Sequence, residues 1–113
     1  MFSLVEETTN RIILHLVSKH LLGSSEINLI ADEMVMVCCR ARIMNKAFVV
    51  DFANVTSMSS AFLGKLVLLN KYAVTRDVRL RLTNVRGDVL EMFNSMHLNK
   101  VFRFEDDNPP TQE

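Results

Sequence analysis

The chain has 113 residues, about half of them apolar, which suits one compact domain and leaves no room for a second. Its 13 basic and 13 acidic side chains balance, and this balance argues against binding to nucleic acid or to an anionic membrane surface. No apolar run reaches the ~18 residues that cross a bilayer, and the acidic start lacks the features of a signal peptide, so we expect a cytoplasmic protein.

The first part of the chain predicts two strands and a helix. Segment 2–5 and the β-branched, apolar segment 11–17 are typical of strands, and the polar residues between them favour a hairpin. Apolar side chains then recur every three or four residues over 26–41, which is the pattern of one helix face. Ser24 or Ser25 is a candidate to cap the start of this helix.

The rest of the chain alternates strands with helices. The continuous apolar run 47–52 predicts a central strand that is buried on both faces. A helix apolar around most of its circumference follows over 61–74, and a cleanly alternating strand follows over 78–83. A third helix over 85–96 and a short strand over 101–104 complete the order ββαβαβαβ.

This order predicts one α/β domain over residues 1–104, followed by a disordered acidic tail over 105–113. We expect a mixed, mostly parallel sheet of four to five strands with helices packed against it. Partners of such sheets usually meet the loops beyond the carboxyl ends of the parallel strands. That rule points to the turn after Phe52 and, at the far end of the turn, to Ser59 and Ser60.

The stretch 49–66, VVDFANVTSMSSAFLGKL, resembles the signature of the STAS family. That signature is an apolar strand, an acidic or amide turn, an apolar residue, and then Asp-Ser-Ser-Gly-Leu-Gly opening a helix. The match has no gap: Met58 falls on the apolar residue, Ser60 on the first serine, and Leu63 and Gly64 on the closing pair. The element order and the closing stretch NVRGDVLEMFNSMHLNKVFRF are also similar, so the resemblance covers residues 2–104.

Three motif positions depart from the family pattern. Ser59 stands in place of the aspartate, Ala61 in place of the second serine, and Phe62 in place of the glycine. The lost aspartate removes an acidic group beside the first serine, and Phe62 places a bulky ring near the docking surface.

The resemblance implies a regulatory module of the anti-sigma factor antagonist type. In that family the unphosphorylated form binds a serine-kinase anti-sigma factor and so frees a sigma factor. The kinase phosphorylates the motif serine, and a serine/threonine phosphatase restores the active form. The phosphoacceptor implied here is Ser60, and the implied partner-binding residues are Asp51, Thr56, Ser57, Met58, Ser59, Phe62 and Lys65.

The residues themselves leave several alternatives open. Ser59 and Ser60 suit helix capping as well as regulation, because serine is a preferred N-terminal cap. Asp51 suits either a hydrogen bond to the following loop or the holding of a phosphate or a metal near Ser60, and Phe62 suits either the core or a contact surface. The alternative function is a scaffold or self-associating STAS domain that is never phosphorylated.

The sequence argues against an enzyme. It shows no paired catalytic carboxylates, no Ser/His/Asp order with supporting context and no Gly-rich phosphate loop. Its two adjacent cysteines and three separated histidines do not stand at metal-ligand spacing, so we expect neither a metal nor a cofactor. We expect a monomer or a weak homodimer.

Overall fold

The structure, a computed structural model, describes residues 3–105 and is built on a mixed sheet of five strands. In spatial order these are β1 (Ser3–Glu7), β2 (Arg11–Leu16), β4 (Ala47–Asp51), β6 (Leu80–Thr83) and β7 (Arg103–Phe104). β1 and β2 form an antiparallel hairpin, and every later neighbouring pair is parallel. The prediction of a mixed, mostly parallel sheet is confirmed, whereas residue 2 of the first predicted strand and residues 106–113 of the predicted tail lie outside the described residues.

Two very short strands, which the sequence analysis missed, form a second parallel sheet. They are β3 (His20–Leu21) and β5 (Ser57–Met58), and they pair His20 with Ser57 and Leu21 with Met58. Two residues are too few to show the alternation that identifies a strand in sequence. The predicted order ββαβαβαβ therefore lacks these two elements, of which β5 lies within the loop between β4 and α2 and β3 lies beside that loop.

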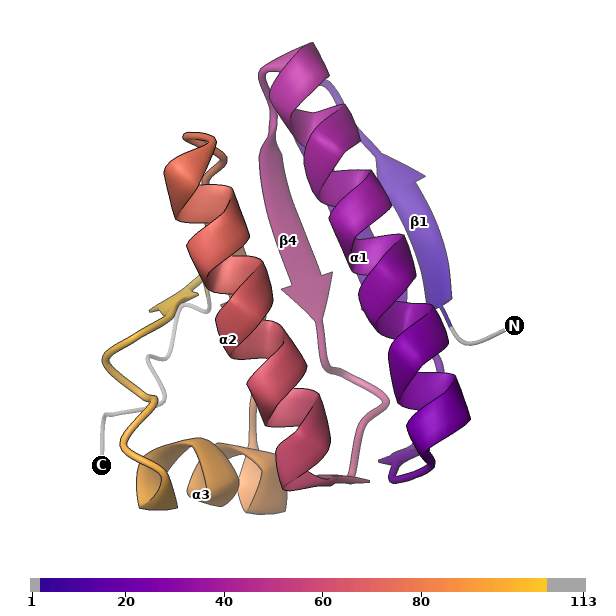
Figure 1. Cartoon of the computed structure of the whole chain (residues 1–113), viewed down its shortest axis with the longest axis vertical. Coiled ribbons are helices and arrows are strands. Elements are labelled where there is room, and N and C mark those ends of the chain that lie inside the picture. The colour runs from indigo at the N-terminus through magenta and orange to yellow at the C-terminus, as the bar shows by residue number, and fades with distance from the viewer. Residues whose placement is uncertain (1–2, 106–113) are drawn as a thin grey trace.

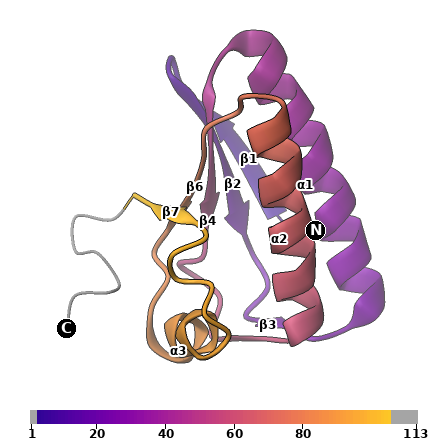
Figure 2. The same ribbon diagram turned by 60° about the vertical axis from the view of Figure 1, so that its left-hand side comes forward.

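Two long helices, α1 (Ser24–Met44) and α2 (Ser60–Thr75), lie side by side on one face of the large sheet (Figures 1 and 2). Both begin at the same end of the molecule, the lower end in Figure 1. The short helix α3 (Gly87–Ser95) crosses that end and contacts β5. Within residues 3–105, no helix is both long enough and apolar enough to cross a membrane.

The core lies between the large sheet and this helix pair. Leu80 and Leu82 of β6 face it, as the alternating pattern predicts, and three successive β4 residues are 0–1% exposed, so the central strand is buried on both faces. At the lower end the Phe93 ring packs edge-to-face against Phe52, Phe102 and Phe104. This aromatic cluster joins α3 to the end of β4 and to the last strand.

The helix ends differ from the prediction in a physically clear way. Gly23, and neither predicted serine, caps the start of α1, and no side chain bonds the free N–H groups there. Asn45 ends α1 in the left-handed conformation, with φ 56° and ψ 48°. The N–H of Lys46 then reaches back to the carbonyl of Ala41 at 2.9 Å, which satisfies a carbonyl that the helix leaves unpaired.

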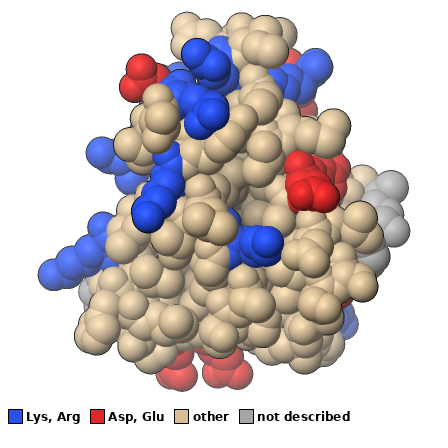
Figure 3. All heavy atoms as spheres, viewed as in Figure 1, with Lys and Arg blue, Asp and Glu red and all other residues tan. Residues whose placement is uncertain are grey.

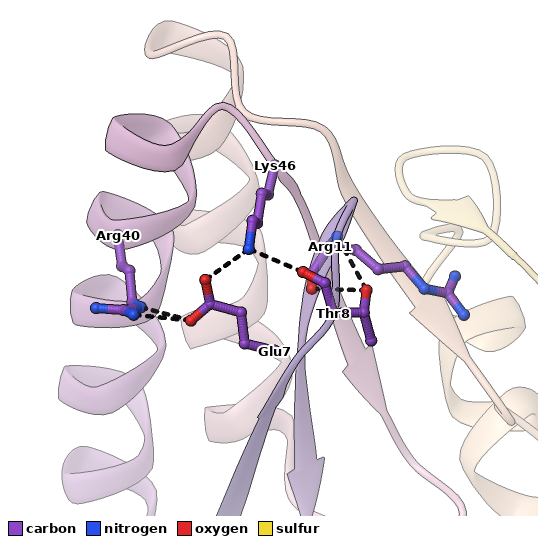
Figure 4. A network of polar contacts seen from close by, with 5 residues as sticks. All are labelled: Glu7, Thr8, Arg11, Arg40 and Lys46. Carbon is purple, nitrogen blue, oxygen red and sulfur yellow. Dashed lines mark hydrogen bonds and ion pairs between the residues drawn. The ribbon is translucent and has the colours of Figure 1, made fainter.

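A network of ion pairs ties the β1–β2 hairpin to the end of α1 (Figure 4). The Glu7 carboxylate accepts hydrogen bonds from Arg40 at 2.8 Å and from Lys46 at 2.6 Å. Lys46 also donates to the carbonyl of Thr8 at 2.8 Å. The bonds from Lys46 and Arg40 hold the pKa of Glu7 below its usual value, so the carboxylate stays ionised in this network.

Candidate functional site

The motif loop, residues 52–59, joins the end of β4 to the start of α2, and Asp51 anchors its first turn. One carboxylate oxygen of Asp51 accepts hydrogen bonds from the N–H of Ala53 at 2.9 Å and from the Asn84 amide at 2.8 Å. The other oxygen lies 2.7 Å from Nδ1 of His15. Of its two predicted roles, Asp51 thus performs the bonding of the loop.

Asp51 and His15 each shift the pKa of the other towards its charged form. Burial raises the pKa of Asp51, but hydrogen bonds from Asn84, His15 and the backbone outweigh it, so the pKa lies below its usual value. Partial burial lowers the pKa of His15, yet its bonds to Glu6 and Asp51 raise that pKa overall. The imidazole bridges the two carboxylates, with Nε2 2.9 Å from Glu6.

The middle of the motif loop is held against the segment that precedes α1. The N–H groups of Thr56 and Ser57 both donate to the carbonyl of Lys19, at 2.8 and 3.2 Å. Nδ1 of His20 lies 2.7 Å from the Ser57 hydroxyl. The N–H of Ser59 donates to the carbonyl of Leu21 at 2.9 Å. These bonds prolong the β3–β5 pairing and fix where the loop delivers its last residues.

Ser60 is exposed and is the first residue of α2. The carbonyl of Ser59 accepts the N–H groups of Phe62 and Leu63, at 3.1 and 3.4 Å, so the helix begins there. The helix itself offers no acceptor to the N–H groups of Ser60 and Ala61. No acidic side chain stands in the first turn, so the positive end of the helix dipole is not offset there.

Ser59 is the cap residue of α2 but does not use its side chain for this purpose. Its backbone is extended, with φ −90° and ψ 164°, and no side-chain hydrogen bond caps the helix. Among the described residues the Ser59 Oγ is buried and has no hydrogen-bond partner. The expected serine therefore stands at the cap position, but its hydroxyl makes no bond to the N–H groups of the first turn.

The predicted partner-binding residues divide into an exposed and a buried group. Thr56 is exposed, and Ser57 is half-buried. Lys65 is half-buried and lines a hollow of about 210 Å³ between α1 and α2. Met58 and Phe62 are 5% and 0% exposed, because both pack into the core, so they support the loop from beneath and offer a partner no open side chain.

This arrangement can carry a charged group at the start of α2. An exposed hydroxyl at the positive end of a helix is a suitable place for a phosphate, because the free N–H groups and the dipole both favour negative charge. Within residues 3–105, no group of three His, Cys, Asp or Glu side chains could hold a metal ion.

Sequence reasoning missed four residues that build the site: His15, Lys19, His20 and Asn84. The signal for His15 and Asn84 was available, because the carboxyl ends of adjacent parallel strands meet at one edge of a sheet. Both residues lie at or just beyond the ends of strands that flank β4. Lys19 and His20 belong to the unpredicted β3 region and gave no such signal.

Comparison with known proteins places these observations in a family. The model of the STAS domain family matches residues 2–108, and no curated protein is a significant match in sequence. A STAS-domain anti-sigma-factor antagonist protein from Planctomyces limnophilus superposes with a TM-score of 0.79 and 17% identity, covering 93% of this chain and 91% of that one. For a Thermotoga maritima protein assigned as an anti-sigma factor antagonist, the TM-score is 0.75 and the identity 16%, with coverage of 92% and 86%.

The anti-sigma factor antagonist SpoIIAA, a Bacillus cell fate determinant, also shares the fold. Its unphosphorylated form superposes with a TM-score of 0.67 and 13% identity, covering 92% of this chain and 87% of that one. Its phosphorylated form gives a TM-score of 0.64 and 14% identity, with coverage of 93% and 92%. At these identities the structural likeness establishes the fold.

Proposed function

This chain belongs to the STAS domain family, and from that premise we propose that it is a regulatory protein-binding module switched by phosphorylation of Ser60. Its proposed partners are an anti-sigma factor that is a serine kinase and a serine/threonine phosphatase. In this proposal the kinase binds the unphosphorylated chain, the phosphatase restores that form, and both act in the cytoplasm. The chain itself catalyses no reaction.

The observation that carries the proposal is the position of Ser60. Its hydroxyl belongs to an exposed residue at the junction of a hydrogen-bonded loop and the start of α2. A kinase can reach such a hydroxyl without unfolding the domain, because no core residue covers it. Serine also occupies the position that matches the phosphoacceptor of the family motif.

The physics of the switch follows from this position. A phosphate adds about −1.5 to −2 charges and three acceptor oxygens. At the start of α2 the free N–H groups stabilise that charge, so the domain keeps its fold. Within an interface the phosphate repels nearby acidic side chains of the partner and must give up its bound water. A loss of about 3 kcal/mol of binding free energy weakens binding more than a hundredfold.

The likeness to SpoIIAA supports this proposal. That protein has been solved in both its unphosphorylated and its phosphorylated form, and both forms share the fold of this chain. A phosphate on this fold therefore needs no large change of shape. The proposed contact surface consists of Ser60 with Thr56, Ser57, Ser59 and Lys65, which Asp51 orders through the loop and which Met58 and Phe62 support from the core.

The experiment combines the purified chain with ATP and each anti-sigma-factor-type serine kinase of the organism that encodes it. Intact-mass measurement should show one added phosphate, which Ser60→Ala abolishes. Ser24→Ala is the matched control, because it removes an exposed hydroxyl from the first residue of α1, outside the proposed contact surface, and should leave the phosphate in place. Calorimetry should then show that phosphorylation weakens kinase binding at least about a hundredfold.

Failure of every cognate kinase to phosphorylate the chain would reject the switch, and so would a phosphate that Ser60→Ala does not remove. Retained kinase binding by the phosphorylated chain would reject the proposed mechanism even if Ser60 accepts the phosphate.

A second candidate function is a scaffold that binds partners without phosphorylation. The departure at Ser59 favours it, because a buried, unbonded hydroxyl replaces the acidic group of the family motif beside the acceptor. Ser60→Asp distinguishes the two functions. The scaffold keeps its partner when Ser60 becomes an aspartate, whereas the switched module loses it.

A further inference from the structure

The outward face of α1 carries an apolar stripe that no other part of the described chain covers. Leu29, Met36 and Ile43 are 56%, 71% and 82% exposed. They are spaced seven residues apart, so successive members of the stripe lie within about 20° of each other around the helix. The stripe is separate from the core-facing set of α1, which is Ile27, Ile30, Met34, Val37, Cys38 and Ala41.

Two opposite charges flank the centre of this stripe. Asp32 and Arg40 stand four residues before and four residues after Met36, so both project from the same side of the helix as Met36. Asp32 is exposed, and the side chain of Arg40 is 58% exposed. Arg40 donates to Glu7 from Nε and Nη2 at 3.0 and 2.8 Å, which leaves three of its five N–H donors for another acceptor.

The stripe and its charges form a pattern that is complementary to itself. Reversing α1 about Met36 exchanges Leu29 with Ile43 and Asp32 with Arg40. A second copy of α1 laid antiparallel on the first therefore places Leu29 on Ile43, and Met36 on Met36. The same arrangement pairs Asp32 with Arg40 twice. A parallel copy would instead set Asp32 against Asp32 and Arg40 against Arg40, which repel.

We propose that this chain forms a weak homodimer in which α1 packs antiparallel on α1 of a second copy, with the two-fold axis at Met36. Such an interface is isologous, since the same patch serves both copies. The flexible Met36 side chain can pack readily against Met36 of the second copy at the two-fold axis. One face of a 21-residue helix, about 30 Å long, buries less than a standard interface, so the dissociation constant is expected to be micromolar or weaker.

The surface around the apolar stripe is compatible with a second copy of the chain packed on α1. Figure 3 views the face that carries α1 and α2, and uncharged side chains cover most of it. Most of the Lys and Arg on this face lie towards its upper end and its left side, and a further basic group lies near its centre. Because both helices begin at the lower end, an antiparallel dimer places its two Ser60 residues at opposite ends and leaves both open. The dimer thus goes beyond the proposed function and does not depend on it.

Sedimentation equilibrium of the full chain up to about 1 mM tests the association. Met36→Glu places two like charges at the axis and should weaken the dimer at least about tenfold. Val74→Glu is the matched control, because Val74 is an apolar α2 residue, 66% exposed, outside the stripe. Asp32→Arg should weaken the dimer, because it sets an arginine against Arg40 of the second copy. Circular dichroism confirms that each variant is folded.

Cysteine cross-linking tests the direction of packing. In a Cys39→Ser background the remaining Cys38 is 0% exposed, so only introduced cysteines react. Met36→Cys should form a covalent dimer under mild oxidation. A mixture of the Leu29→Cys and Ile43→Cys chains should cross-link, whereas Leu29→Cys alone should not.

Three results would overturn the homodimer: a monomer over the whole concentration range, an association that Met36→Glu leaves unchanged, or one that Val74→Glu disrupts. Self-cross-linking of Leu29→Cys would overturn the antiparallel arrangement.

Discussion

Ser59 shows how a side chain can occupy a favoured position without performing its usual role. A serine cap that bonds the first turn of a helix stabilises a protein by about 1 kcal/mol relative to alanine. Here the Oγ is buried and has no hydrogen-bond partner among residues 3–105. The desolvation of this hydroxyl therefore costs free energy that no hydrogen bond offsets. The start of α2 therefore depends on the backbone of Ser59.

We predict that Ser59→Ala leaves the free energy of unfolding within about 0.5 kcal/mol of the original value or raises it. Ser57→Ala is the comparison, because the Ser57 hydroxyl bonds His20 at 2.7 Å and its loss should cost about 0.5–1 kcal/mol. Urea denaturation followed by circular dichroism measures both. A loss of about 1 kcal/mol or more for Ser59→Ala would mean that the hydroxyl does bond the helix.

Asn45 matters because of how α1 ends. A left-handed residue at a helix end allows the following N–H groups to reach back to unpaired carbonyls, and glycine and asparagine adopt this conformation most easily. The Lys46 side chain, which follows directly, belongs to the network around Glu7. The turn at Asn45 thus determines where the hairpin and α1 are joined.

We expect Asn45→Ala to lower the free energy of unfolding by about 1 kcal/mol, since alanine tolerates a positive φ poorly. Asn45→Gly should match or slightly exceed the stability of the original chain. Chemical denaturation of the three proteins under one set of conditions tests this order. Equal stability of the alanine and glycine variants would show that the left-handed turn costs alanine nothing here.

Most of these elements could be predicted because their apolar residues repeat with a clear period. The helices over 24–44 and 60–75 and the buried central strand are long enough to show it. β3 and β5 are not, because each contributes two residues and their pairing joins segments that lie far apart in the chain. The cap at Gly23 was missed for a related reason: two serines beside it fit the usual pattern better.

The position of Ser60 in the candidate site could be predicted from the sequence, whereas the surroundings of the other site residues could not. Ser60 was expected at the start of a helix, and the structure places it there on the surface. Whether Met58 and Phe62 face a partner or the core depends on the packing of α2 against the sheet, which no local pattern reveals. The contact between His15 and Asp51 depends on the register of β2 against β4, which pairs these two residues directly.

At the scale of the whole molecule, His15 makes stability depend on pH. Its pKa in the folded chain lies above the ordinary 6.5, so its protonated form is stabilised by folding. This contribution is fully present below about pH 6.5 and is lost as the pH rises through the folded value. The Asp51 carboxylate, whose pKa is lowered, remains ionised throughout that range.

We predict that the stability difference between the original chain and His15→Gln is larger near pH 5.5 than near pH 9. One pKa unit corresponds to about 1.4 kcal/mol, and the side chain is 32% exposed, so solvent reduces the expected change to below that figure. Unfolding curves at several pH values measure it. A difference that is flat, or that grows with pH, would contradict a raised pKa.

The two-residue pairing of β3 with β5 limits how the motif loop can move. β3 ends three residues before α1 begins, and β5 ends two residues before α2 begins. The hydrogen bonds between β3 and β5 therefore link the first turns of the two helices. A partner protein that moves the loop outward must break the β3–β5 hydrogen bonds or move the start of α1 together with the loop. A force on the loop is therefore shared with the start of α1, which lies more than thirty residues before β5 in the chain, and the loop cannot move alone.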